Sequence, residues 1–127
     1  MSLRSPLGAV LGLGSAGGTH HFWRQRVSSV ALMPLGAWFL VALALQGDYS
    51  RAALQTFVAA PLHAVLLLLL VVIGSHHSCL GLQVVVEDYV RGKAAKTAIL
   101  VLLELAHLVL GAAGAFAVLK IAFGSAA

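Results

Sequence analysis

Long apolar runs alternate with short polar segments along the chain. The apolar runs occupy about residues 27–46, 61–90 and 97–123, and the polar breaks QGDYSR and RGKAAK lie at 46–51 and 91–96. A helix needs about 20 consecutive apolar residues to cross the hydrocarbon core of a bilayer. The pattern therefore predicts an all-α membrane protein with three transmembrane helices.

A glycine-rich start and two prolines divide the chain further. Residues 1–26 are too polar and too rich in glycine to span a bilayer, so we expect an irregular segment on the membrane surface, followed by a three-helix domain at 27–127. Pro34 falls within the first span, where a membrane helix tolerates it with a kink. Pro61 suits the first turn of a helix, so residues 52–60 are expected to approach the membrane before a long helix begins.

The composition excludes a soluble catalytic domain. Hydrophobic residues make up 61% of the 127 and charged residues only 9%, whereas a soluble domain has about 25% charged residues. The single cysteine, Cys79, excludes an internal disulfide and a metal site made of several thiolates. Any chemistry must therefore come from a cofactor or be shared with a partner.

The distribution of basic residues predicts the orientation in the membrane. With three crossings, the N-terminal segment and the second polar break lie on the same side. This side carries Arg4, Arg24, Arg26, Arg91, Lys93 and Lys96, and the other side carries Arg51 and Lys120. The positive-inside rule then places the N-terminus in the cytoplasm and the C-terminus on the opposite, periplasmic side. Basic loops of this kind indicate membrane topology, not nucleic-acid binding.

The predicted second helix carries ionisable residues on one face. At 100° per residue, His77, Gly81, Val84 and Asp88 point within about 60° of one another, and His77 lies roughly 16 Å below Asp88, near the middle of the bilayer. An ionisable side chain at that depth faces a partner, a cavity or a cofactor. Histidine is a usual axial ligand of haem iron, and Gly81 leaves room for a flat macrocycle. This face therefore suits haem b.

Only one of the two adjacent histidines can share this face. His76 points about 100° away from His77, so the geometry favours His77 as the haem ligand. The alternative for either imidazole is a hydrogen bond to a neighbouring helix, which is the role we expect of His76.

Asp88, Tyr89 and Arg91 stand together where this helix reaches the membrane surface. Tyrosine is common at this depth simply because its ring is amphipathic. Together with Asp88 and Arg91, the phenol could instead form a polar pocket that hydrogen-bonds a carbonyl group of a quinone, whose tail is lipid-soluble. The residues alone leave both interpretations open.

The order and spacing of these residues resemble a known family. His77-x-x-x-Gly81, followed by Val85, Asp88 and Tyr89, resembles the second helix of the smaller membrane-anchor subunit of succinate dehydrogenase (respiratory complex II), a cytochrome b556-type protein. The segment GTHHFWRQRVSS is similar to the segment that precedes the family's first span. The resemblance covers roughly residues 18–123 and implies a helical bundle completed by a larger anchor subunit.

The resemblance also implies roles for individual residues. His77 would be one axial ligand of haem b, with the other supplied by the larger cytochrome b anchor subunit. Tyr89 would hydrogen-bond a ubiquinone carbonyl, and Asp88 would orient the basic groups around the quinone head group. Arg26 and His20 would lie near the haem propionates, although the doubled histidine at 20–21 leaves open which imidazole aligns.

The family's reaction is shared among several subunits. A flavoprotein subunit oxidises succinate to fumarate, and an iron–sulfur subunit passes the electrons to ubiquinone at the bacterial inner membrane. FAD and the iron–sulfur clusters are expected only in those partners, in agreement with the single cysteine here. We therefore expect a non-catalytic subunit that contributes to the haem and quinone sites.

Two other functions fit parts of the pattern. His63 lies about 21 Å before His77 on nearly the same face, a spacing that suits a dihaem transmembrane electron carrier with His107 as a further ligand. A cofactor-free structural anchor or small transporter would need only the hydropathy. Glu104 and His107, about one turn apart in the third span, could form a proton relay, but a structural hydrogen bond is the simpler interpretation.

Overall fold

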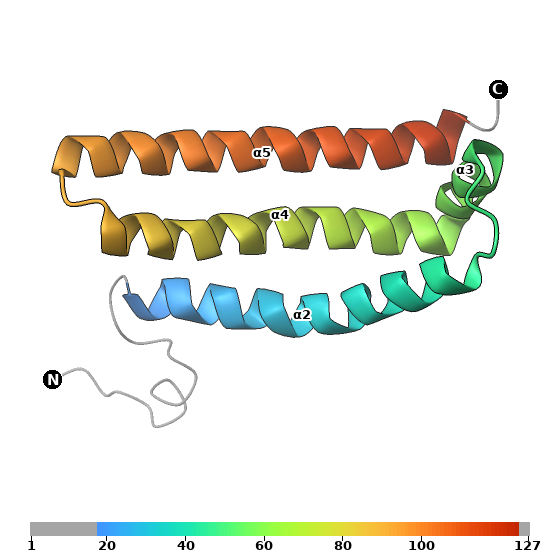
Figure 1. Cartoon of the computed structure of the whole chain (residues 1–127), viewed down its shortest axis with the longest axis horizontal. Coiled ribbons are helices and arrows are strands. Elements are labelled where there is room, and N and C mark those ends of the chain that lie inside the picture. The colour runs from blue at the N-terminus through green and yellow to red at the C-terminus, as the bar shows by residue number, and fades with distance from the viewer. Residues whose placement is uncertain (1–17, 125–127) are drawn as a thin grey trace, which may run out of the picture.

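The computed structural model describes residues 18–124, which form three long helices and one short helix (Figure 1). α2 spans Gly18–Leu45, α3 spans Arg51–Ala59, α4 spans Pro61–Tyr89 and α5 spans Lys93–Gly124. No strand occurs in this part of the chain. α2, α4 and α5 are long and apolar enough to cross a membrane, so the predicted all-α fold with three spans is confirmed.

α2 begins before the span that hydropathy predicts. Residues 18–26, which were expected to be irregular, are helical, and residues 1–17 lie outside the described part of the chain. The sequence has no glycine or proline between Gly18 and Pro34, so nothing interrupts the backbone hydrogen bonds. Hydropathy measures how well a residue suits the lipid interior. Arginine, as at Arg24, lowers the hydropathy of the segment although it is a good helix former.

α3 forms the connection between α2 and α4. Gly47 adopts a left-handed backbone conformation with φ 69°, which glycine accepts without strain. Ser50 is the N-cap of α3, and its side chain accepts a hydrogen bond from the backbone N–H of Ala53. Pro61 occupies the first turn of α4, the position that the sequence predicts, where its missing N–H has no helical partner to lose.

The connection between α4 and α5 is shorter than predicted. Only residues 90–92 are non-helical, because α5 already begins at Lys93. Lys96 Nζ donates a hydrogen bond to the backbone oxygen of Glu87, 2.7 Å away, and so satisfies a carbonyl that the end of α4 leaves without a helical partner. A single lysine thus ties the first turn of α5 to the last turn of α4.

α4 lies between α2 and α5 (Figure 1). Two glycines of α5 face α4 closely: a Cβ on Gly114 would lie 2.7 Å from Val71 Cγ1, and one on Gly111 would lie 3.2 Å from Ser75 Oγ. Small residues at helix interfaces permit such close approach in membranes, where dispersion contacts between helices drive association. The glycines therefore set the α4–α5 spacing.

Residues 18–124 form a small hydrophobic core. Phe57, Ala64, Leu67 and Val118 pack together where α3 meets α4 and α5. Many large apolar side chains of the three long helices are exposed. Exposed apolar surface on this scale marks a surface that contacts a membrane or another protein.

Candidate functional site

His77 lies near the middle of α4 and faces α2. Its Nδ1 atom is 2.8 Å from Ser28 Oγ on α2. Ser28 is the only buried polar side chain among the described residues, with 6% of its surface exposed. Its Oγ is also 2.9 Å from the backbone oxygen of Gln25. A hydroxyl group that is anchored to its own helix therefore holds His77.

With Ser28 donating to the Gln25 carbonyl, one tautomer of His77 completes both contacts. A carbonyl oxygen can only accept, so the contact with Gln25 uses the single hydroxyl proton of Ser28. Ser28 Oγ then accepts from His77, and Nδ1 is the protonated nitrogen. In a neutral imidazole the other nitrogen, Nε2, keeps its lone pair, and it has no hydrogen-bond partner within residues 18–124. This is the tautomer of a histidine that binds a metal through Nε2.

The predicted His77 face is partly packed and partly open. A Cβ on Gly81 would have Gln25 Nε2 of α2 as its nearest neighbour, at 3.8 Å. Val84 is half-buried and Asp88 is exposed. The Gln25 amide is the end of a flexible side chain, so it can move away from Gly81 without a shift of the backbone.

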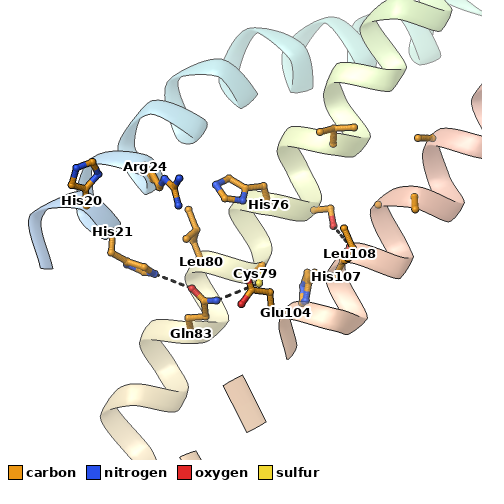
Figure 2. Close-up of a pocket in the computed structure, with 15 residues that line it drawn as sticks. His20, His21, Arg24, His76, Cys79, Leu80, Gln83, Glu104, His107 and Leu108 are labelled. Atoms are coloured by element: carbon orange, nitrogen blue, oxygen red, sulfur yellow. Dashed lines mark hydrogen bonds between the residues drawn. The ribbon is translucent and has the colours of Figure 1, made fainter. Parts of the chain in front are cut away.

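His76 lines a cavity between the three long helices. The cavity has a volume of about 580 Å³, within the range typical of ligand sites. Its polar lining comprises His20, His21, Arg24, Ser75, His76, Gln83, Glu104 and His107. Figure 2 shows the α2 side chains on one side of His76 and the α5 side chains on the other. His21 Nε2 lies 3.2 Å from Gln83 Oε1, a contact that joins α2 to α4.

Asp88 and Tyr89 lie at the exposed end of α4. The side chain of Tyr89 is 82% exposed, and Asp88 is also exposed. Neither side chain makes a hydrogen bond with another described residue. The quinone pocket that the sequence suggests is therefore not closed by this chain's own described residues, and its remaining walls would come from elsewhere.

The two residues expected near the haem propionates point in different directions. His20 lines the cavity, whereas Arg26 is exposed, with its guanidinium carbon 4.7 Å from the centre of the Phe22 ring. Arg26 points about 200° around α2 from Ser28, away from α4. Arg24 is the arginine that lies beside His20 on the cavity.

Two further histidines contact other residues of the chain. His107 Nε2 is 3.3 Å from Ser78 Oγ on α4, and its Nδ1 is 2.9 Å from the backbone oxygen one turn earlier. His63 Nδ1 is 2.9 Å from the backbone oxygen of Phe57, and its ring centre is 4.2 Å from that of Phe57 and 5.6 Å from that of Trp38. Within residues 18–124, no three His, Cys, Asp or Glu side chains are placed to hold a metal ion together.

Comparison with known proteins decides what kind of membrane protein this is. The sequence profile of the succinate dehydrogenase/fumarate reductase transmembrane subunit matches residues 1–120. The chain belongs to this family. Among its relatives, the succinate dehydrogenase hydrophobic membrane anchor subunit of Paracoccus denitrificans is 35% identical over 97 residues, which cover 76% of this chain and 75% of that protein. The subunit of the same name from Rickettsia prowazekii (strain Madrid E) is 29% identical over 91 residues, 72% of this chain and 73% of that protein.

No solved structure matches the chain. The family nevertheless accounts for the three exposed apolar helices, because a membrane anchor places them in lipid and against other subunits. The resemblance deduced from the motif is confirmed, and the chain is a multi-pass membrane-anchor subunit of succinate dehydrogenase.

Two features of the site could not be found from the sequence. Ser28 is one of two adjacent serines in an apolar span, and such a serine can bond to its own helix or to any neighbouring one. Gln83 likewise gives no sign of its partner. Only the rotation of α2 against α4 selects Ser28 for His77 and His21 for Gln83.

Proposed function

We propose that this anchor subunit serves a bacterial succinate:ubiquinone oxidoreductase, with His77 as one axial ligand of haem b and Tyr89 as part of the ubiquinone site. The observation that carries the proposal is the hydrogen-bond chain from His77 through Ser28 to Gln25. It leaves the Nε2 lone pair free on an imidazole near the middle of a membrane-spanning helix. The family supplies the enzyme complex in which such a ligand has a use.

Two features around His77 support a haem ligand, although His77 is not among the residues that line the cavity. Neutral imidazole is a usual axial donor to haem iron, and a hydrogen bond at Nδ1 fixes the orientation of the ring. Beside Gly81 only the end of the Gln25 side chain lies close. Bound haem b would supply a one-electron redox centre. We assign the second axial ligand to the larger cytochrome b anchor subunit, as the resemblance implies. His63 lies about 21 Å from His77 along the same helix, and both ring nitrogens of His107 have hydrogen-bond partners.

His76 is the rival ligand, because it lines the cavity together with His20 and Arg24. It makes no hydrogen bond with another described residue, so nothing within residues 18–124 fixes its tautomer. The ring of His77 is held by Ser28, and this favours His77 over His76 as the haem ligand. For the propionates, His20 and Arg26 remain the residues that the resemblance implies, and Arg24 is an alternative donor. An arginine at either position offers paired N–H groups to a carboxylate.

Tyr89 and Asp88 are proposed to form this chain's share of the ubiquinone site. The phenol O–H can donate to a quinone carbonyl, and the Asp88 carboxylate can orient a neighbouring basic group. Both side chains are exposed in the isolated chain, as expected of residues that contact a quinone head group and a second subunit. The walls that this chain lacks would then come from the larger anchor and the iron–sulfur subunit.

The basic residues support one orientation. The start of α2, the end of α4 and the start of α5 lie at the same end of the molecule (Figure 1). Arg24, Arg26, Arg91, Lys93 and Lys96 gather there. The positive-inside rule then puts this end in the cytoplasm of a bacterial cell and the C-terminus in the periplasm. The iron–sulfur subunit and the FAD-containing flavoprotein subunit would dock at the cytoplasmic end.

A matched pair of variants tests the ligand. We expect His77→Ala to remove or loosen haem b in the purified complex, measured by the absorption bands of the reduced haem, and His76→Ala to retain it. General damage to α4 would affect both variants, since the two positions are adjacent. Loss of haem in His76→Ala alone, or retention in both variants, would contradict the assignment.

A further inference from the structure

We propose that Ser28 is a positioning residue that aims His77 at the haem iron and strengthens its Nε2 as a donor. This inference rests on the proposed haem ligand and adds a residue from a different helix to its site. The two residues are 49 positions apart in the chain, and neither the motif around His77 nor the segment before the first span points to the pair.

Ser28 is buried and makes two contacts. Burial of a hydroxyl group is costly unless it is hydrogen-bonded, and Ser28 is 6% exposed. The bond to Gln25 O at 2.9 Å would by itself satisfy its proton. The second contact, 2.8 Å to His77 Nδ1, uses its acceptor capacity and crosses to α4. Both distances are those of well-formed hydrogen bonds.

The bond acts on the metal through the imidazole ring. When Nδ1–H donates to an oxygen, the basicity of the ring rises and Nε2 becomes a stronger donor. A stronger donor stabilises ferric iron more than ferrous iron, so this bond lowers the midpoint potential of the haem. The bond also restrains the His77 ring, so the direction of Nε2 relative to α2 would be set before a haem binds.

Ser29 offers a matched control. Its Oγ donates to the same backbone oxygen of Gln25, at 2.8 Å. It points about 100° away from Ser28 and makes no hydrogen bond to His77. Ser29→Ala therefore removes a hydroxyl from the same turn of α2, with the same acceptor, and leaves the imidazole untouched.

The test compares three variants of the purified complex: Ser28→Ala, Ser28→Thr and Ser29→Ala. Redox titration gives the haem midpoint potential, electron paramagnetic resonance reports the ligand field of the ferric haem, and transfer to excess apomyoglobin gives the rate of haem loss. We expect Ser28→Ala to raise the midpoint potential, shift the ferric signal and weaken haem retention about 10- to 100-fold. Ser28→Thr keeps a hydroxyl group and, like Ser29→Ala, should retain the wild-type values.

The possible failures are distinguishable. If His77→Ala removes the haem but Ser28→Ala matches Ser29→Ala in all three measurements, this inference is wrong and the proposed ligand stands. If Ser28→Ala only reduces the yield of complex, while the bound haem keeps its wild-type potential, Ser28 is a packing residue and the inference is again wrong. If His77→Ala retains haem with the wild-type potential, the proposed ligand itself is wrong.

Discussion

Gly114 is the position where the packing of the helices makes the sharpest prediction. A Cβ on Gly114 would lie 2.7 Å from Val71 Cγ1, about 1 Å closer than ordinary carbon contacts. Val71 is β-branched, so its side chain has essentially one rotamer in a helix and cannot turn away. Gly114→Ala therefore forces α4 and α5 apart. Overpacking of this kind costs about 1–3 kcal/mol, which corresponds to about 5- to 150-fold in the equilibrium between packed and separated helices.

The higher helix propensity of alanine does not offset this cost, because separated membrane helices stay helical in lipid. The assay is the thermal midpoint of the detergent-purified complex, followed by the intact peak in size-exclusion chromatography after heating. Gly36→Ala is the control, since a Cβ there meets nothing within 4 Å in this chain. We expect a lower midpoint for Gly114→Ala and recovery when Val71→Ala is added. Equal midpoints for Gly114→Ala and Gly36→Ala would refute the reasoning.

Two further predictions concern the exposed end of α4 and the α4–α5 contact. Tyr89→Phe should reduce succinate–quinone turnover about 10-fold, which corresponds to the loss of one hydrogen bond of about 1.4 kcal/mol, while the soluble subunits still reduce an artificial dye. Tyr49→Phe, at the other end of the bundle, is the control. Unchanged quinone kinetics in Tyr89→Phe would make Tyr89 a simple interfacial residue. Ser75→Ala removes a hydrogen bond of 2.8 Å to the backbone oxygen of His107. Such bonds average about 0.6 kcal/mol in membranes, so its thermal midpoint should fall less than that of Gly114→Ala; a larger fall would contradict this ranking.

The long helices could be predicted because membrane insertion depends on local properties. The apolar run that contains His77 is bounded by Pro61 and by the polar residues near Tyr89, and α4 begins at Pro61 and ends at Tyr89. The start of α2 at Gly18 was missed for a physical reason. Hydropathy reports which residues prefer lipid, whereas the helix continues through polar residues until the backbone itself is interrupted.

The candidate site could likewise be predicted only in part. The direction and depth of His77 follow from helix geometry alone, because neighbouring residues on one helix have fixed relative positions. Its hydrogen bond to Ser28 depends on how α2 is rotated against α4, which no local pattern encodes. The cavity that joins His20, His76 and Glu104 depends on the placement of three helices at once.

The positions of Arg24 and Arg26 also could not be predicted from the sequence. The resemblance assigns Arg26 to the haem propionates, but the structure places Arg24 beside His20 and Arg26 against Phe22. A helix position specifies a direction only relative to its own helix. Which arginine meets a cofactor therefore depends on the neighbouring helices and on the partner subunit.

The most direct test of the account is to purify the complex in mild detergent through a tag on this chain. The co-purifying subunits are then identified, and the haem content is measured from the absorption spectrum. The account predicts a flavoprotein, an iron–sulfur subunit and a larger cytochrome b anchor, together with a single haem b per complex. Two haems per complex, or a chain that carries no haem alongside those partners, would contradict it.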